Sequence, residues 1–538
     1  MTPRCVRDAV FDVLAQAGVT DVFGNPGTTE IPFLVGMGDR FRFVHALQET
    51  VVIGAAAGYG LASGRPGVAV VHAVPGLGNG MGALSGAAYG RAPVVVLVGQ
   101  QDSRMLFDRP LLSGPIAEMA GPLVKYVHEP VRPQDVPRAV ATALRMATSG
   151  VPGPTMVVLP CDFADVPGGD VPAEGLVAAG GGLADAAGDE LVAAVRSARN
   201  PAIVAGTELV SSGGWHELVE LASALDVAVY SGGMEALLGF PTSHPAYRGE
   251  LPLQTSALLR TLGDHDLVLL LGNGGYLLYT YDPEPLDGLL ARTVLVTEDP
   301  EPAARFAGRG SVLAPPAAAV RRLLSSVALD GDGPGERITT ARSVVADRPD
   351  ARPSAPGAFT AEAVLARCAA ALTFDRVVVD EAISNSGLVR ATMRPDAPRS
   401  YLRAANAALG FGISAAVGAQ VARPDSRVVA ILGDGAFQYA PQTLWTAARS
   451  GLPVVFIVLN NGGYKILHDY AEVYYDAAQV PGLAIDGVRI AEIAAAYGVD
   501  AWAVGSMDEL DAALERALSA SGPVLLDVAV AADGRSAF

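Results

Sequence analysis

Two stretches near the end of the chain decide the fold: RVVAILGDG, Arg427–Gly435, and PVVFIVLNN, Pro453–Asn461. Each is an unbroken apolar run of the kind that forms a parallel strand covered on both faces. The sequence between them, with QTLWTAARSGLP, predicts one crossover helix, because neighbouring parallel strands need a connection of about a dozen residues or more. Both runs therefore end side by side at the carboxyl edge of one sheet, where ligands bind in such folds.

Similar apolar runs alternate with helical stretches along the whole chain, which predicts α/β domains with doubly wound parallel sheets. They are FVHAL (Phe43–Leu47), VAVVHAV (Val68–Val74), PVVVLVG (Pro93–Gly99), TMVVLP (Thr155–Pro160), PAIVAG (Pro201–Gly206), DLVLLLG (Asp266–Gly272), TVLVTED (Thr293–Asp299), RVVVD (Arg376–Asp380) and PVLLDV (Pro523–Val528).

Two segments without apolar periodicity, Val166–Glu190 and Gly331–Gly357, are rich in residues that break helices and strands, and we expect them to be linkers. They divide the chain of 538 residues into three domains, expected at residues 1–165, 186–330 and 357–538. Each is long enough to bury a hydrophobic core of its own.

The composition excludes several classes of function. A net charge of −18 argues against a nucleic-acid-binding protein, which needs a basic face. The longest apolar run, near Leu452–Leu459, is far shorter than the roughly 20 residues of a membrane-spanning helix. Acidic residues close to the N-terminus do not fit a signal peptide. We expect a cytoplasmic protein, because its three cysteines are few, odd in number and far apart, at Cys5, Cys161 and Cys368.

The residues that follow the two C-terminal strands suit a metal ion and a phosphorylated ligand. Mg²⁺ prefers oxygen ligands, and a carboxylate from Asp434, an amide oxygen from Asn461 and the carbonyl of Gly463 can supply them. Gly433 and Gly435 let the backbone approach a diphosphate, and a helix start beyond Ala436 would offer free N–H groups. The alternative is an ordinary turn aspartate and a loop asparagine pair.

The pattern GDG, 24 further residues and NN resembles the thiamine diphosphate motif of the enzyme family that includes benzoylformate decarboxylase, pyruvate decarboxylase and acetolactate synthase. The resemblance covers nearly the whole chain and is strongest to benzoylformate decarboxylases. The matching motifs are VFGNPGTTEIPFL (Val22–Leu34), ALQE (Ala46–Glu49), VVHAVPGLGNGMGAL (Val70–Leu84), AALGF (Ala407–Phe411) and TLWTAA (Thr443–Ala448). It implies a pyrimidine-binding domain, a middle domain and a diphosphate-binding domain.

Glu49 matches the glutamate that bonds N1′ of the aminopyrimidine and activates the cofactor. From the residues alone, the favoured interpretation of a carboxylate at a helix start is only a cap or a partner of the helix dipole. The resemblance implies that Glu49 serves the cofactor of a neighbouring subunit, so that a homodimer is the minimum active unit and a homotetramer the expected assembly. It also implies cofactor contacts from Ser384, from the carbonyl of Ala407 and from Leu409, for which ordinary packing is the alternative.

Three residues are expected on the substrate side. By resemblance His72 handles protons during decarboxylation, although a structural histidine is the alternative, and Thr28 contacts the substrate carboxylate. The sequence departs from the family where benzoylformate decarboxylases have a second catalytic histidine: here GGYLLYTYDP, Gly274–Pro283, places Tyr279. Because tyrosine titrates near 10 and histidine near 6.5, this change weakens the assignment to benzoylformate itself.

The expected wall of the substrate pocket is mainly apolar. It comprises Ile383, Ile466, Leu467 and Tyr470, together with Arg403, which replaces an apolar aromatic residue. Arg403 either faces the pocket, where it would favour a polar or carboxylate tail, or turns to solvent or to an acid.

The sequence thus predicts non-oxidative decarboxylation of an aryl or branched 2-oxo acid to an aldehyde and CO₂, dependent on thiamine diphosphate and Mg²⁺. A carboligase of the acetolactate synthase type is the first alternative, and an inactive scaffold homologue is the second. The middle part of the chain contains no G-x-G-x-x-G element, so no FAD is expected.

Overall fold

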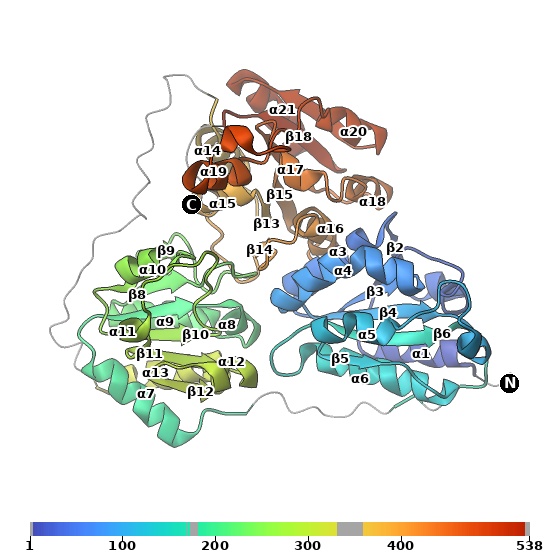
Figure 1. Cartoon of the computed structure of the whole chain (residues 1–538), viewed down its shortest axis with the longest axis horizontal. Helices are drawn as coiled ribbons and strands as arrows, with labels where there is room; N and C mark the ends of the chain where they lie inside the picture. Colours follow the sequence, from blue (N-terminus) through green and yellow to red (C-terminus); the bar gives the residue numbers. More distant parts are fainter. Residues whose placement is uncertain (1–3, 169–170, 173–180, 331–358, 533–538) are drawn as a thin grey trace.

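The chain folds into three six-stranded sheets with helices on both faces of each (Figure 1). The computed structural model describes residues 4–168, 171–172, 181–330 and 359–532. All the paired strands within these sheets are parallel. This confirms the fold class predicted from the buried apolar runs. Among the described residues, no helix has the length and apolar character needed to cross a bilayer.

The N-terminal sheet has the strand order β2-β1-β3-β4-β6-β5. Its strands are β1 (Asp21–Gly24), β2 (Arg42–His45), β3 (Gly67–Val71), β4 (Val94–Gln100), β5 (Tyr126–His128) and β6 (Thr155–Pro160). The α-helices of this part are α1 (Val6–Gln16), α2 (Ile31–Leu34), α3 (Glu49–Ser63), α4 (Ala73–Tyr89), α5 (Ile116–Ala120) and α6 (Val136–Thr148).

The middle sheet has the order β12-β11-β10-β7-β8-β9. Its strands are β7 (Pro201–Ala205), β8 (Ala228–Ser231), β9 (Tyr247–Glu250), β10 (Leu267–Leu271), β11 (Thr293–Thr297) and β12 (Gly310–Leu313). Its helices are α7 (Asp185–Ser197), α8 (Thr207–Ser211), α9 (Trp215–Leu225), α10 (Thr255–Leu262), α11 (Asp287–Leu290), α12 (Pro300–Arg305) and α13 (Pro316–Asp330).

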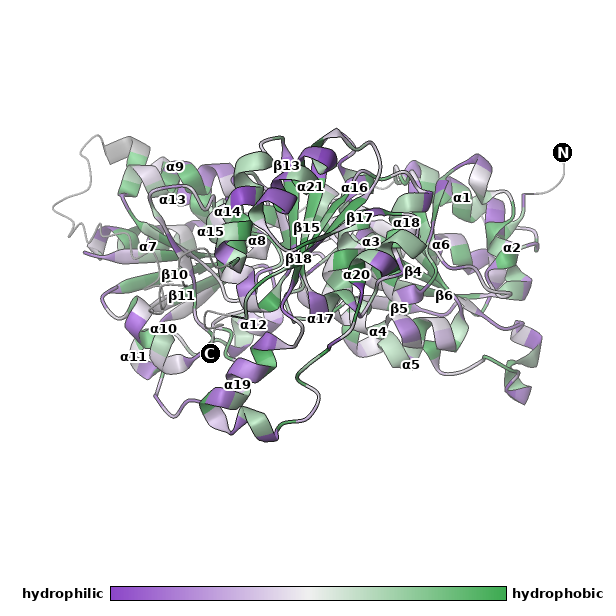
Figure 2. Cartoon of the chain, turned by 90° about the horizontal axis from the view of Figure 1, so that it is seen from above, coloured by the Kyte–Doolittle hydropathy of each residue, from purple (hydrophilic) through white to green (hydrophobic). Residues whose placement is uncertain are grey.

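The C-terminal sheet has the order β14-β13-β15-β16-β18-β17. Its strands are β13 (Arg376–Glu381), β14 (Tyr401–Arg403), β15 (Arg427–Gly433), β16 (Val455–Asn460), β17 (Asp500–Val504) and β18 (Val524–Ala529). Its helices are α14 (Ala361–Ala371), α15 (Ser386–Met393), α16 (Phe411–Ala422), α17 (Asp434–Phe437), α18 (Thr443–Arg449), α19 (Lys465–Tyr474), α20 (Ile490–Ala496) and α21 (Met507–Ser519). Figure 2 shows strands such as β15 and β18 as a hydrophobic layer between helices with polar outer sides.

Two local predictions were wrong. The connection between β15 and β16 is two short helices, α17 and α18, instead of one crossover helix. Pro441 lies between them, and a proline lacks the N–H that a continuing helix needs and disfavours helical geometry at the residue before it. The run Val68–Val74 does not form one strand either, because β3 ends at Val71 and His72 caps α4.

The two predicted linkers have different outcomes. The segment Val166–Glu190 overlaps α7, which begins at Asp185, so the final part of the expected linker is helical. The segment Gly331–Gly357 lies outside the described residues. The expected domain bounds stay predictions.

Two glycine- and alanine-rich helices, α3 and α16, join the N-terminal and C-terminal domains. A Cβ atom on Gly58 would lie 2.1 Å from the carbonyl oxygen of Ala415, and one on Gly418 would lie 1.7 Å from that of Ala55. Backbone therefore packs directly on backbone at this crossing. The helices share one hydrophobic core with strands of both sheets, and this fixes the two sheets relative to each other.

Candidate active site

Glu49 is the first residue of α3 and is only 6% exposed. Its carboxylate is held by two amides: Oε1 accepts a hydrogen bond from Asn25 Nδ2 at 3.0 Å, and Oε2 accepts one from Asn79 Nδ2 at 3.1 Å. The helix is capped by Gln48, whose side chain accepts from the backbone N–H of Thr50. Glu49 is thus not the cap of its helix, and its orientation is set by groups from the loop after β1 and from α4.

His72 lies next to this carboxylate in a space that glycines keep open. A Cβ atom on Gly76 would lie 3.2 Å from Glu49 Oε1 and 3.2 Å from His72 Cβ. One on Gly27 would lie 2.2 Å from Cγ of the imidazole ring. The next residue, Ala73, has a φ of 44°, a left-handed conformation that costs a non-glycine residue about 1–3 kcal/mol. Such stored strain is typical of functional sites.

Nδ1 of His72 contacts two side chains from the loop after β1. It lies 2.9 Å from Glu30 Oε2 and 3.0 Å from Thr29 Oγ1. Glu30 and Thr29 are both buried, and Thr29 Oγ1 donates to Glu30 Oε1 at 2.5 Å. Thr28, the residue expected to bind the substrate carboxylate, is exposed immediately before them.

Four residues around Glu49 and His72 were not predicted from the sequence: Asn25, Thr29, Glu30 and Asn79. All four lie inside motifs that resemble the family, but their roles depend on contacts over 24 to 43 residues along the chain. The available signal was a cluster of amide, hydroxyl and carboxylate groups directly after a buried strand, where α/β folds place ligands.

The C-terminal sheet brings Asp434 and Asn461 together, because Gly433 pairs with Leu459 at the ends of β15 and β16. Asp434 Oδ2 accepts from the backbone N–H groups of Gly462 at 2.8 Å and Gly463 at 3.0 Å. Asn461 Oδ1 also accepts from Gly463, at 3.2 Å. The aspartate therefore organises the turn that carries the asparagine.

The donors at this edge fit a small divalent cation. A carboxylate, an amide oxygen and a backbone carbonyl are the hard oxygen ligands that Mg²⁺ prefers. Burial raises the pKa of the Asp434 carboxyl, and backbone hydrogen bonds from Gly435, Gly462 and Gly463 oppose that rise. A cation bound to Asp434 would also stabilise the charged carboxylate and so lower its pKa, as these hydrogen bonds do.

The glycines of the GDG motif leave space for a ligand on one side. A Cβ atom on Gly433 would have its nearest neighbour 3.9 Å away, whereas one on Gly435 would lie 2.6 Å from the ring of Tyr464. Ala436 is buried. The helix start expected beyond Ala436 is corrected: α17 already begins at Asp434, and it is a single turn of four residues with little macrodipole.

The loop between β14 and α16 has an unusual backbone. Ala407 has a φ of 54°, and Gly410, which caps α16, has a φ of 81°. Asn406 holds the loop by donating to Ser85 Oγ at 2.8 Å and accepting from the N–H of Ala408 at 3.2 Å. Ala407 is exposed and Leu409 is half-buried.

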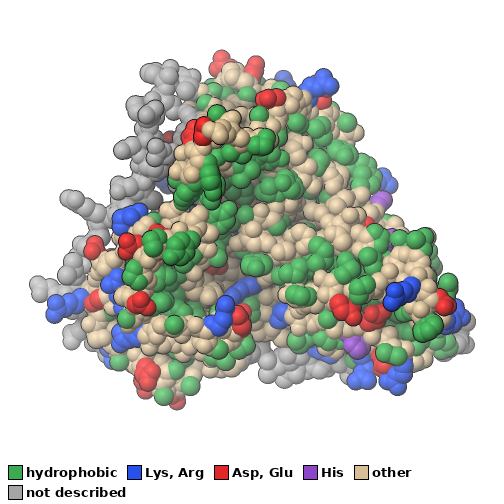
Figure 3. Space-filling view, viewed as in Figure 1, with side chains coloured by type: hydrophobic (Ala, Val, Ile, Leu, Met, Phe, Trp, Pro, Cys, Tyr) green, Lys and Arg blue, Asp and Glu red, His purple; other side chains and the backbone are tan. Residues whose placement is uncertain are grey.

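The apolar residues expected in the substrate wall lie on two neighbouring elements. Ile383 and Ser384 belong to a short 3-10 helix, η6 (Ile383–Asn385), which contacts α19. Helix α19 carries Ile466, Leu467 and Tyr470. Ile466 is half-buried, and Leu467 is 49% exposed. Figure 3 shows hydrophobic side chains gathered over the part of the C-terminal domain where Figure 1 places α19.

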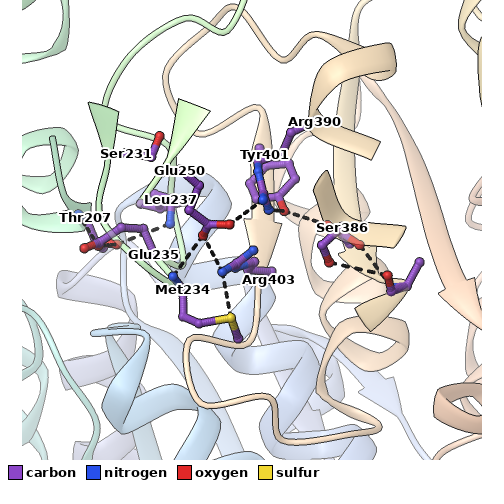
Figure 4. Close-up of polar contacts among 12 residues, drawn as sticks. Thr207, Ser231, Met234, Glu235, Leu237, Glu250, Ser386, Arg390, Tyr401 and Arg403 are labelled. Carbon is purple, nitrogen blue, oxygen red and sulfur yellow. Dashed lines mark hydrogen bonds and ion pairs between the residues drawn. The ribbon is translucent and has the colours of Figure 1, made fainter. Parts of the chain in front are cut away.

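Of the two orientations expected for Arg403, the structure shows the one in which the side chain turns to an acid. It is 4% exposed, and its Nη2 atom donates to Glu250 Oε1 at 2.6 Å and to Met234 Sδ at 2.8 Å (Figure 4). Both partners belong to the middle domain. The guanidinium is thus paired with an acid between two domains, because an unpaired charge would be costly to bury.

Tyr279 lies in the middle domain, in the segment after β10. The residue is 67% exposed, and its backbone N–H donates to the carbonyl of Leu253 at 2.9 Å. Its position relative to the substrate stays a prediction.

Comparisons with known proteins agree with this arrangement. Residues 4–111 match the model of the N-terminal TPP binding domain of thiamine pyrophosphate enzymes, residues 189–308 match the central domain, and residues 383–528 match the C-terminal TPP binding domain.

Full-length relatives match as well. The chain is 35% identical to benzoylformate decarboxylase of Pseudomonas aeruginosa, with 98% of each chain covered. It is 28% identical to acetolactate synthase 3 of Brassica napus, over 98% of this chain and 83% of the relative. The solved thiamine diphosphate-dependent 4-hydroxybenzoylformate decarboxylase of Rhodococcus jostii superposes with a TM-score of 0.90, 33% identity and 99% coverage of each chain. The chain therefore belongs to the thiamine pyrophosphate-dependent enzyme family.

Proposed function

We propose that this protein is a thiamine diphosphate- and Mg²⁺-dependent decarboxylase that converts an aryl or branched 2-oxo acid, such as benzoylformate, to an aldehyde and CO₂. The observation that carries the proposal is the buried Glu49 carboxylate, which two asparagine amides hold next to His72. Two groups that can exchange protons are thereby oriented at one sheet edge.

The cofactor would be held by residues of both TPP binding domains. Bound thiamine diphosphate supplies the carbon nucleophile and the electron sink that decarboxylation of a 2-oxo acid requires. Asp434, Asn461 and the carbonyl of Gly463 would bind Mg²⁺. The other contacts to the cofactor would come from Ser384, from Ala407 and Leu409 in the loop between β14 and α16, and from the backbone of the GDG segment at Gly433, Gly435 and Ala436.

The protein's own groups would hold and move protons. Glu49 would bond the aminopyrimidine and exchange a proton with it. His72, oriented through Nδ1 by Glu30, would exchange a proton through Nε2. Thr28 would donate its hydroxyl to the substrate carboxylate, and Tyr279 would stand where a second proton donor is needed.

An apolar side chain on the substrate would contact Ile383, Ile466, Leu467 and Tyr470. The pairing of Arg403 with Glu250 supports an uncharged tail, because this guanidinium is committed to the middle domain. The names of the Pseudomonas and Rhodococcus relatives support an aryl group.

We further propose a homodimer as the minimum active unit, a homotetramer as the assembly and the cytoplasm as its location. No flavin is expected, because the middle part of the sequence contains no G-x-G-x-x-G element.

The test is CO₂ release and product analysis with purified protein, thiamine diphosphate and Mg²⁺. Benzoylformate, a branched 2-oxo acid, pyruvate and 2-oxoglutarate are compared. We expect aldehyde from the first two, with kcat/KM about 10–100-fold above that for pyruvate, the discrimination that burial of an apolar group provides. A 2-hydroxy ketone as the main product without added aldehyde would instead indicate a carboligase. No turnover and no cofactor binding would indicate an inactive homologue.

A further inference from the structure

A buried ionic cluster joins the middle and C-terminal domains (Figure 4). Its centre is Glu250, the last residue of β9, which forms ion pairs with Arg403 at the end of β14 and with Arg390 on α15. The side chains of Arg390 and Arg403 are 9% and 5% exposed. One middle-domain carboxylate therefore binds two separate elements of the C-terminal domain.

The charges of the cluster are balanced. Arg390 Nη1 donates to the hydroxyl of Tyr401 at 3.1 Å, and that hydroxyl donates to Asp380 Oδ2 at 2.6 Å. The cluster thus contains two guanidinium groups and two carboxylates, and the Tyr401 hydroxyl connects Asp380 to Arg390. Burial opposes ionisation of Glu250, but Arg390 and Arg403 outweigh it and lower the pKa of this carboxyl.

The backbone reinforces the connection. The N–H of Met234 donates to Glu250 Oε1 at 2.9 Å, and the N–H of Arg403 donates to the carbonyl of Ala236 at 3.2 Å. The sulfur of Met234 also accepts from Arg403. The last residue of β14 is consequently attached to the middle domain through both its side chain and its backbone.

The attached residue begins the loop that carries the proposed cofactor contacts. Ala407 follows Arg403 by four positions, and its left-handed backbone requires the loop ends to be fixed. At the other end, the carboxylate of Glu381 accepts from the N–H groups of Gly412 and Ile413, each at 3.1 Å, in the first turn of α16. The loop is thus held at each end by a carboxylate, buried in the case of Glu381 and 20% exposed in the case of Glu250, which belongs to another domain.

We propose that Glu250 is a positioning residue for the cofactor. Through Arg403 it fixes residues 404–410, so that the Ala407 carbonyl and the Leu409 side chain have the geometry that binds the aminopyrimidine end. The middle domain then contributes to cofactor affinity without touching the cofactor. This inference rests on the proposed function, since it assumes that thiamine diphosphate binds at this loop.

The test uses Glu250→Gln in the full-length protein. The matched control is Glu217→Gln, which removes a carboxylate of the same domain from a more exposed ion pair with Arg321, at 2.8 Å. Thiamine diphosphate affinity is measured by calorimetry in the presence of Mg²⁺, and amide hydrogen exchange of residues 404–413 is measured without cofactor. We expect the dissociation constant of Glu250→Gln to rise at least about tenfold, a size typical of coupling within one ion-pair network. We also expect faster exchange in the loop, while the control matches wild type in both measurements.

A merely structural role would give a different result. If Glu250→Gln lowers the melting temperature but leaves the cofactor dissociation constant and the loop exchange at wild-type values, the positioning role is refuted. If that variant does not fold, Arg403→Lys decides: it keeps the charge but loses the planar fork. Weaker cofactor binding by this variant supports the proposal, and wild-type affinity overturns it. Failure of wild type itself to bind thiamine diphosphate would overturn the proposed function as well.

Discussion

Glu30 and His72 are linked by a 2.9 Å contact between Oε2 and Nδ1 that determines which ring nitrogen is available for chemistry. The hydroxyl of Thr29, also within 3.0 Å of Nδ1, already donates its hydrogen to Glu30 and can only accept. Because both partners of Nδ1 are acceptors, the neutral imidazole of His72 must carry its hydrogen on Nδ1. Nε2 is left as the nitrogen that can exchange a proton with a ligand.

Replacing the carboxylate tests this arrangement. Glu30→Gln should lower kcat by about 10²–10⁴-fold, the contribution of a well-placed acid–base group. Cofactor affinity should change little, because Glu30 contacts His72 and not Glu49. Steady-state kinetics and calorimetry measure the two quantities, with the exposed Glu220→Gln as the control. A wild-type kcat would show that Glu30 does not orient a catalytic histidine.

Gly27 should be essential for turnover, because the imidazole ring of His72 lies directly against it. In Gly27→Ala the new methyl group would overlap the ring of His72, at 2.2 Å from Cγ, and force it to move. We expect a loss of kcat comparable to that of Glu30→Gln. Gly38→Ala is the control, since a Cβ atom there meets nothing within 4 Å. Full activity of Gly27→Ala would mean that the His72 position does not matter for turnover.

Glu49 is expected to act by proton exchange with the bound cofactor. Glu49→Gln preserves the size of the side chain but cannot gain and lose a proton. Exchange of the cofactor's C2 hydrogen, followed by NMR, should slow by about 10²–10⁴-fold, which corresponds to roughly 3–5 kcal/mol of barrier. Binding of the cofactor should be largely retained. Exchange at the wild-type rate would exclude this role.

Asp434 is the only anionic ligand proposed for Mg²⁺. Asp434→Ala removes that ligand and also the acceptor for the Gly462 and Gly463 N–H groups. We expect a steep loss of both Mg²⁺ and thiamine diphosphate affinity by calorimetry, with unchanged secondary structure by circular dichroism. Asp434→Asn keeps an oxygen acceptor for the turn and separates the two effects. Unchanged cofactor affinity in both variants would refute the metal site.

The sequence was most informative where chemistry follows a long buried strand. Asp434 and Asn461 could be placed together because β15 and β16 are continuous apolar runs, and parallel strands end at the same edge. Short strands were missed, among them β14 and β17, because three to five residues at a sheet edge carry little periodic signal.

The partners of charged residues could not be predicted. Arg403 looked like a pocket residue by its position, yet its acid, Glu250, is 153 positions away and in another domain. Likewise, nothing in the sequence near His72 indicates that Glu30, 42 positions earlier, is its partner. Such pairs depend on how the sheets are stacked, which local patterns do not encode.

Glu381 makes a pH-dependent contribution to stability that can be measured. Its carboxylate caps the first turn of α16, but burial, aided by nearby Asp380 and opposed by the backbone N–H groups, raises its pKa to about 7. In the unfolded chain the group titrates at its ordinary value near 4.5. Between these values the folded protein retains a proton that the unfolded chain has lost, so the free energy of unfolding falls as the pH rises through this window.

Glu381→Gln remains neutral and lacks this dependence. Relative to wild type, its free energy of unfolding should therefore increase between pH 4.5 and pH 7, by up to about 3 kcal/mol, and then level off. Urea unfolding of the cofactor-free proteins at pH 5, 6, 7 and 8 measures the difference. Glu515→Gln, an exposed carboxylate of the same domain, controls for the loss of a charge as such. A difference between Glu381→Gln and wild type that stays constant from pH 5 to pH 8 would show that Glu381 does not titrate in this range.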